Sequence, residues 1–175
     1  MTFVQRMVGA AKLNVDVYEE VEADKTATGQ ATLVVVLSSV ATGVGWLGQG
    51  VSGLLLGTIT ALLAWFVWAY LTYYIGTKFF PEPQTSADHG ELLRTLGFAA
   101  SPGILRVFGV IPFFPVVIFV ITGVWMLVST IIAVRQALDY NSTGRAIGVC
   151  LVGWLVQSAL LGVLYIFLPD VATGF

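Results

Sequence analysis

The sequence predicts an all-α, polytopic integral membrane protein: a bundle of five transmembrane helices preceded by an amphipathic helix at the membrane surface. Hydrophobic residues make up 57% of the 175 residues and charged residues 10%, whereas a soluble domain carries about 25% charged residues. Ionisable Asp, Glu, Lys, Arg and His are absent from residues 26–77, 108–133 and 146–169. Stretches this long and apolar fit the hydrocarbon core of a bilayer and cannot all be enclosed by a soluble domain of this length.

The first 25 residues are expected to form a cytoplasmic amphipathic segment rather than a signal peptide, because they have no apolar core. Apolar residues recur there at helical spacing, which favours a helix lying at the membrane surface. The apolar positions are Phe3, Val4, Met7, Val8 and Ala11, with Gln5, Arg6 and Lys12 on the other side. Downstream, Glu19, Glu20 and Glu22 lie on an acidic face, which is either solvated or a docking face for a partner.

A membrane domain is predicted over residues 26–169, followed by a short tail, residues 170–175. About 20 residues suffice to cross the hydrocarbon core as a helix. The spans are expected at about residues 26–46, 51–77, 91–111, 116–137 and 146–168. The first two spans are separated only by a short glycine-rich joint, so they form an antiparallel hairpin.

The third span is the least regular. Asp88 followed by Glu91 resembles a capping box that opens a helix. A Ser101-Pro102-Gly103 break then interrupts the apolar pattern. The 21 residues of 91–111 are therefore just enough to cross the bilayer if the helix is kinked. If this segment instead entered the bilayer and returned, the protein would have four spans.

Positive charges give the expected orientation. Seven of the eight Lys and Arg residues lie in the N-terminal segment or at the joints after the second and fourth spans, when Arg94 and Arg135 at the adjoining span ends are counted with those joints. Basic joints stay on the cytoplasmic side. This distribution predicts a cytoplasmic N-terminus and, with five spans, a C-terminus outside.

Arg106 is the one ionisable residue well inside a predicted span, because Glu91, Arg94 and Arg135 all lie within three residues of a span end. An arginine at membrane depth is costly and is by default a candidate functional residue. Its long side chain can instead reach the interface or contact a structural carbonyl. The remaining possibilities are a contact with a lipid headgroup or a partner, and a role in transport.

No pattern in the chain indicates a catalytic constellation, a metal site or a cofactor. His89 is the only histidine and has no second His or Cys nearby in sequence, as a metal site would need. Gly43, Gly45 and Gly48 spell GxGxxG, but no strand precedes them, so a dinucleotide site is rejected. The net charge of −2 and the lack of a basic run exclude nucleic-acid binding.

Small residues suggest where helices pack closely. Gly53 and Gly57 form a GxxxG motif, which lets two helices approach within the chain or across a dimer. Pro102 is expected to shape the packing of the third span through its kink.

Two stretches of the sequence resemble the Yip1 domain family. Leu93 to Pro102 carries an arginine, a glycine and an aromatic residue ahead of a proline. Ala133 to Ala146 has the arginine, polar turn, basic residue and small residue that precede the last helix in that family. The resemblance covers roughly residues 16–168.

This resemblance implies a five-helix integral membrane protein with a cytoplasmic N-terminus. Eukaryotic relatives act in vesicle trafficking and bind Rab-type GTPases, but their DLYGP-type motif has no counterpart here, so GTPase binding is not carried over. The short N-terminus resembles prokaryotic members, which implies the prokaryotic cytoplasmic (inner) membrane. The family supplies no agreed catalytic residues.

The leading functional hypothesis is a non-enzymatic scaffold or accessory protein that binds another membrane protein, a larger complex or a second copy at its cytoplasmic face. Glu19, Glu20 and Glu22 are the expected acidic docking face. Arg94, Arg135 and Arg145 would hold phosphates or close the joints.

Two other hypotheses remain open. A small transporter or channel would need a polar path, for which the candidates are Gln30, Ser38, Ser39, Thr42, Thr58, Thr60, Ser129, Thr130, Gln157 and Ser158. Hydrogen bonding between helices explains such residues equally well. An enzyme acting on lipid would rest only on Arg106 and His89.

Overall fold

A computed structural model describes residues 1–45, 50–111 and 113–167, with side chains except at 50–56, 161 and 163–167. Those residues form helices and no strand. The elements are α1 (Phe3–Ala11), α2 (Val15–Ala23), the 3₁₀ helix η1 (Lys25–Ala27), α3 (Thr28–Gly45), α4 (Gly50–Lys78), α5 (His89–Ala99), the 3₁₀ helix η2 (Ser101–Val110), α6 (Pro115–Ala137) and α7 (Thr143–Phe167). The predicted all-α class is confirmed.

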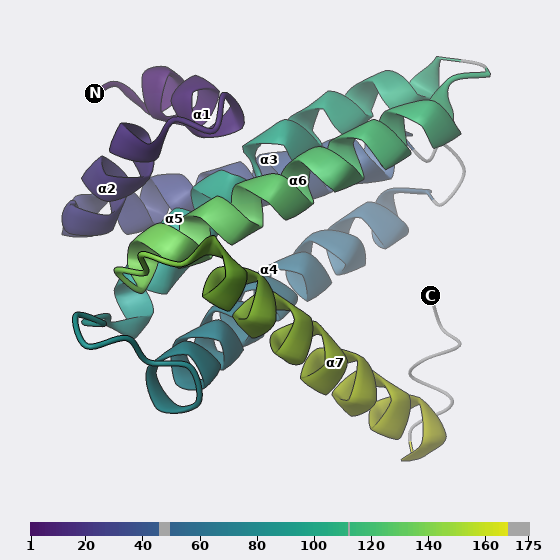
Figure 1. Cartoon of the computed structure of the whole chain (residues 1–175). Coiled ribbons are helices and arrows are strands. Elements are labelled where there is room, and N and C mark those ends of the chain that lie inside the picture. Colours follow the sequence, from purple (N-terminus) through teal and green to yellow (C-terminus); the bar gives the residue numbers. More distant parts are fainter. Residues whose placement is uncertain (46–49, 112, 168–175) are drawn as a thin grey trace.

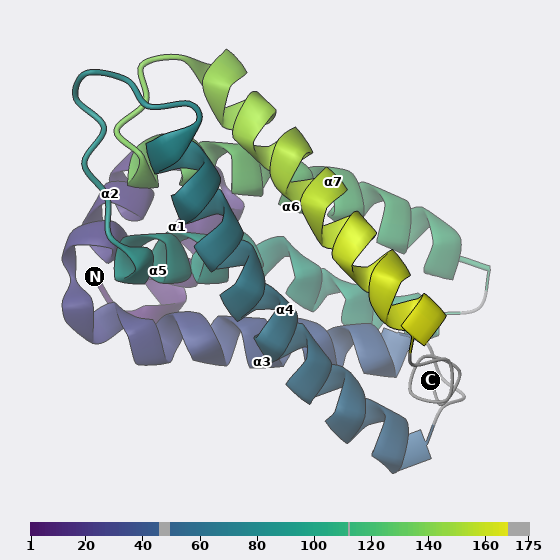
Figure 2. The ribbon, with the colours of Figure 1, turned by 90° about the horizontal axis from the view of Figure 1, so that it is seen from below.

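Three elements run side by side at the centre of the bundle. η2 packs against α3 and α6 (Figure 1). The α1–α2 hairpin covers one side through contacts with α5, η2 and α6, while α4 and α7 pack against each other on the other side (Figure 2). Loops 79–88 and 138–142 lie at one end of the bundle. We call it the basic end because seven of the eight Lys and Arg residues lie in the N-terminal 25 residues or in the helix turns next to these two loops, and only Arg106 lies elsewhere.

Within the described residues, four helices are long and apolar enough to cross a membrane: Lys25–Gly45, Gly57–Lys78, Pro115–Ala137 and Thr143–Leu160. They fall on four of the predicted spans. α6 is the most apolar, with a mean hydropathy of 2.5, and it exposes Val116, Val120 and Val124 on its outer face. Apolar side chains on the outside of a bundle are expected where lipid replaces water as the solvent.

The remaining predicted span, residues 91–111, is two elements instead of one helix. Pro102 has no N–H to donate to the carbonyl of Phe98, and the Ser101 hydroxyl donates to that carbonyl instead, at 2.6 Å. Beyond this point the Gly103 N–H bonds to Ala100 O, three residues back, and the chain continues as a 3₁₀ helix. The helix therefore breaks at residues 101–103, as predicted, but residues 91–111 are not among the four long apolar helices.

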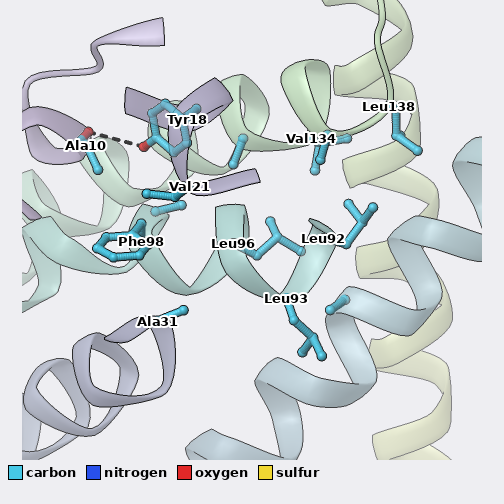
Figure 3. Close-up of a cluster of buried hydrophobic side chains, with 14 of the residues drawn as sticks. Ala10, Tyr18, Val21, Ala31, Leu92, Leu93, Leu96, Phe98, Val134 and Leu138 are labelled. Carbon is cyan, nitrogen blue, oxygen red and sulfur yellow. Dashed lines mark hydrogen bonds between the residues drawn. The ribbon is translucent and has the colours of Figure 1, made fainter. Parts of the chain in front are cut away.

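A buried cluster joins the N-terminal hairpin to the bundle (Figure 3). Tyr18 and Val21 of α2 pack with Phe98 of α5 and Val134 of α6, and all four are buried. The Tyr18 hydroxyl also donates to Ala10 O at 3.1 Å, which ties α2 to the end of α1. The hairpin is thus part of the folded core.

The sides of α1 are not arranged as expected. Phe3 and Met7 pack against the core, whereas Val4 and Val8, predicted for the same apolar side, are 58% and 43% exposed. Arg6, expected on the opposite side, is only 6% exposed. The physical reason is that carboxylates of α2 and its C-terminal end compensate the buried guanidinium.

Candidate functional site

A cavity of about 700 Å³ opens at the basic end of the bundle. We call it the acidic pocket because four carboxylates and one arginine line it. Its lining residues are Glu19, Glu22 and Ala23 of α2, Gln84 of loop 79–88, Glu91 of α5, Arg135 and Gln136 of α6, and Asp139, Tyr140 and Asn141 after α6. Residues far apart in the sequence therefore meet in one place.

The turn after α6 shapes one wall of the acidic pocket. Asp139 has a left-handed backbone with φ of 52°, a conformation that Asp and Asn tolerate better than most residues. Arg135 closes the turn by donating from Nε to Tyr140 O at 3.2 Å. The Tyr140 hydroxyl anchors it to α4 by donating to Gly76 O at 2.9 Å.

A second set of contacts holds loop 79–88 against the same turn. The Glu82 carboxylate accepts from the backbone N–H groups of Asn141 at 3.0 Å and Ser142 at 3.3 Å. Arg145 lies 3.3 Å from Glu82 and also donates to Pro81 O at 2.7 Å. The N–H donors lower the pKa of Glu82, with backbone bonding from Asn141 first among the causes. Arg135 and Arg145 thus close the joints, which is one of the two roles expected for them.

Glu22 is the carboxylate most strongly affected by the acidic pocket. Burial raises its pKa from 4.5 to about 7, and the neighbouring charges of Glu91, Asp139 and Glu19 add to the rise, while Arg94 opposes it. Crowded carboxylates disfavour one another's ionised forms. A cation entering the pocket would relieve this repulsion.

Glu19, Glu20 and Glu22 do not form one continuous face. Glu19 accepts from Gln136 of α6 at 3.1 Å. Glu20 turns away and meets the N-terminal amine at 2.8 Å and Arg6 at 3.0 Å. Hydrogen bonding from that amine, followed by Arg6, lowers the pKa of Glu20. Of the three predicted docking residues, only Glu19 and Glu22 line the acidic pocket.

Arg6 organises a cluster that sequence reasoning missed. It lies 2.6 Å from Asp24 and 3.0 Å from Glu20, and it donates to Gln30 of α3 at 3.0 Å. Hydrogen bonds from Thr26 and then Arg6 lower the pKa of Asp24 to about 2. The cluster connects α1, α2 and α3 at one point.

Arg94 is buried and faces inward. Its Nε donates to Val21 O at 3.0 Å and to Glu22 O at 2.9 Å, and its Nη2 also donates to Glu22 O. The last carbonyls of a helix have no hydrogen-bond partner inside the helix. Arg94 supplies the donors for two of these carbonyls at the C-terminal end of α2. The expected contact of Arg94 with a partner or with lipid is replaced by this internal one.

Arg106 lies near the end of the bundle opposite the acidic pocket. Its Nε donates to Thr122 Oγ1 at 3.2 Å and its Nη1 donates to Thr42 Oγ1 at 3.4 Å. The guanidinium carbon lies 5.3 Å from the centroid of the Phe119 ring. Among the described residues, no carboxylate forms an ion pair with Arg106.

The close helix contacts involve glycines other than those of the predicted GxxxG motif. A Cβ at Gly45 would collide with Arg106 O, and one at Gly103 would collide with Ser38 Oγ. Both glycines let η2 approach α3, and Pro102 is buried at the start of η2. Gly57 is exposed and no described residue lies within 4 Å of a Cβ built there. Gly53 falls outside the residues whose side-chain surroundings are described.

The imidazole of His89 packs against three aromatic rings of α4. It makes edge contacts with Phe66, Tyr70 and Tyr73 at centroid distances of 5.0, 5.8 and 6.4 Å. No cluster of three or more His, Cys, Asp or Glu suited to a metal occurs in the described part of the chain. His89 and Arg106 are separated by α5 and half of η2, so the two residues invoked for lipid chemistry do not share a site.

The fold and the site together define a class: an α-helical integral membrane protein with a pocket at one end. The family model described as Yip1 domain matches residues 15–166. The chain belongs to the Yip1 domain family. The matched range starts at the first residue of α2 and ends in α7, so it includes every residue that lines the acidic pocket. No curated protein and no solved structure matches the chain.

Proposed function

We propose that this protein is a non-enzymatic membrane scaffold or accessory protein that binds a basic segment of a membrane partner in the acidic pocket. The observation that carries the proposal is the pocket itself, in which four carboxylates face one arginine. A lysine or arginine side chain entering it would offset the repulsion that raises the pKa of Glu22. Another membrane protein, a larger complex or a second copy can supply such a segment.

The proposed topology has five crossings, with a cytoplasmic N-terminus and an outside C-terminus in a prokaryotic cytoplasmic membrane. The 11 residues of α5 and the ten of η2 have lengths of about 16 Å and about 20 Å. Together they match a hydrocarbon core of about 30 Å. The positions of the basic residues support this direction. In the proposed topology the acidic pocket is on the cytoplasmic side.

Three of the polar residues considered for a transport path form internal hydrogen bonds. Gln30 accepts from Arg6, Thr42 accepts from Arg106, and Ser39 donates to the carbonyl of Val36. These bonds fit helix packing. They favour the scaffold proposal over a transporter or channel.

Affinity purification in mild detergent tests the proposal. The full-length protein should recover a stoichiometric membrane partner or a second copy. Glu22→Gln combined with Asp139→Asn should lower that recovery at least about tenfold, because two charges of the pocket are lost and each charged hydrogen bond contributes about 1.5–3 kcal/mol. Asn also tolerates the left-handed backbone at position 139.

Asp16→Asn is the matched control. It removes one carboxylate from the exposed side of α2, outside the acidic pocket. Recovery should not change in this variant. A protein that purifies alone, or a partner that stays bound to the double variant, contradicts the proposal.

A further inference from the structure

Among the residues that the structure describes, none supplies a negative charge to Arg106. Thr42 and Thr122 each donate their hydroxyl hydrogen to their own helix, to Ser38 O at 2.8 Å and to Ile118 O at 2.7 Å. Their oxygens are therefore left to accept from the guanidinium. Two neutral hydroxyls and a ring face orient the cation, but they supply no negative charge to balance it.

One edge of the guanidinium is free. Nε and Nη1 bond to the two threonines, whereas Nη2 bonds to no described residue. Nη2 is also not among the enclosed polar atoms that lack a partner. This edge is therefore not enclosed by the described residues, and Arg106 as a whole is half-buried.

The depth of this site is set by the helices that hold it. Thr42 precedes Gly45, the last residue of α3, by three positions, which is about 5 Å along the helix. Thr122 follows Pro115, the first residue of α6, by seven positions, or about 10 Å. The guanidinium lies within reach of the headgroup layer at this end of the bundle, but below it, where water is scarce.

We propose that Arg106 binds the phosphate of a membrane phospholipid at the end of the bundle where α3 ends and α6 begins. A phosphate presents oxygens to two N–H groups of one guanidinium and carries the missing negative charge. It is also the anion that every phospholipid places just above the depth of this side chain. Thr42, Thr122 and Phe119 fix the guanidinium so that its free edge faces the lipid.

Native mass spectrometry of the full-length, delipidated protein tests the proposal without any variant. Phosphatidylglycerol and diacylglycerol with identical acyl chains are titrated in parallel, and inorganic phosphate is added as a competitor. One phosphatidylglycerol should bind at least about tenfold more tightly than diacylglycerol, since the phosphate adds charged hydrogen bonds. Equal binding of the two lipids overturns the proposal, and full displacement by millimolar inorganic phosphate assigns the site to free phosphate instead.

Variants locate the binding at Arg106. Arg106→Gln should abolish the preference for phosphatidylglycerol, and Arg106→Lys, which keeps the charge without the planar pair of donors, should retain part of it. Arg145→Gln removes an arginine from the basic end and should leave the preference intact. A monodisperse elution profile identifies which variants are folded, and the lysine variant keeps the test informative if the glutamine variant is not.

Two results would contradict this assignment. The first is an unchanged preference for phosphatidylglycerol in folded Arg106→Gln. The second is a membrane protein that co-purifies with the wild type and is lost from Arg106→Gln while lipid binding is unaffected, which would assign the free edge to a partner's carboxylate. Neither result depends on the acidic pocket, so the proposed function is tested separately.

Discussion

Arg6 and Arg106 lie near opposite ends of the bundle and have different kinds of partners. At the basic end, Arg6 meets the carboxylates of Glu20 and Asp24 at 3.0 and 2.6 Å and the amide of Gln30. At the other end, Arg106 meets two threonine hydroxyls at 3.2 and 3.4 Å and the face of Phe119. The carboxylates of the chain itself compensate Arg6, which indicates a structural role. No described carboxylate pairs with Arg106, and the lipid phosphate proposed above would supply that charge.

The largest effect on stability is expected from removing the guanidinium of Arg6, whose charge is balanced by carboxylates of the chain itself. Arg6→Met should lower the free energy of unfolding by about 3 kcal/mol, because it leaves two carboxylates and an amide without their shared partner. Unfolding in mixed micelles followed by tryptophan fluorescence measures this change.

Lys12→Met is the control for Arg6→Met. Lys12 also belongs to the N-terminal hairpin, is exposed, and forms no ion pair with a described residue. Its loss should change stability by no more than about 0.5 kcal/mol. Equal effects of the two substitutions would remove the contrast between a compensated arginine and a surface charge.

An intermediate effect on stability is expected at Glu22, because the acidic pocket brings four carboxylates together with one arginine. The pKa of Glu22 rises in the folded protein from 4.5 to about 7, so between these pH values the folded state keeps a proton that the unfolded state has released. The contribution of Glu22 to stability therefore falls as pH rises through this range. Glu22→Gln should remove that fall and raise stability at about pH 8 by about 1.5 kcal/mol, since solvent screens a half-buried carboxylate.

Unfolding measured at about pH 5 and pH 8 separates Glu22 from the other carboxylates. Glu20, Asp24 and Glu82 have lowered pKa values, so the stability they contribute is lost only as pH falls below the range of an ordinary carboxylate. Asp16→Asn should leave the difference between the two pH values as it is in the wild type. An unchanged difference in Glu22→Gln would mean that the pocket does not crowd its carboxylates.

The helices were predictable because each is encoded by a pattern of neighbouring residues in the sequence. Long apolar runs place α3, α4, α6 and α7 close to the expected residues, and Asp88 with Glu91 forms the expected capping box at the start of α5. The 3₁₀ continuation after Pro102 was not predictable from hydropathy. It depends on the glycines at 103 and 109, which allow a close approach to α3.

The site was predictable only in part, because its contacts are not local. Arg6 and Asp24 are 18 residues apart and meet because the chain reverses at Leu13, which has a left-handed φ of 62°. Arg94 reaches a carbonyl 72 residues away. Charge spacing along a single helix contains no information about such pairings. Glu20 and Arg94 were expected at the surface, but Glu20 is partly buried against Arg6 and Arg94 is buried.

The smallest effect on stability is expected from Arg106→Gln, and it distinguishes the role of Arg106 from that of Arg6 most directly. In detergent without phospholipid, Arg106→Gln should change the free energy of unfolding by no more than about 1 kcal/mol, because the wild-type cation has only two neutral hydroxyls and one ring face to lose and its desolvation opposes these contacts. Added phosphatidylglycerol should stabilise the wild type more than the variant by about 1 kcal/mol, since a ligand that binds the folded state stabilises it according to its affinity. Arg6→Met should show the reverse pattern, a large loss of stability and an unchanged response to lipid, because its partners belong to the chain. If phosphatidylglycerol stabilised wild type and Arg106→Gln equally, the guanidinium would be a tolerated internal charge, and the contrast between the two ends would reflect packing alone.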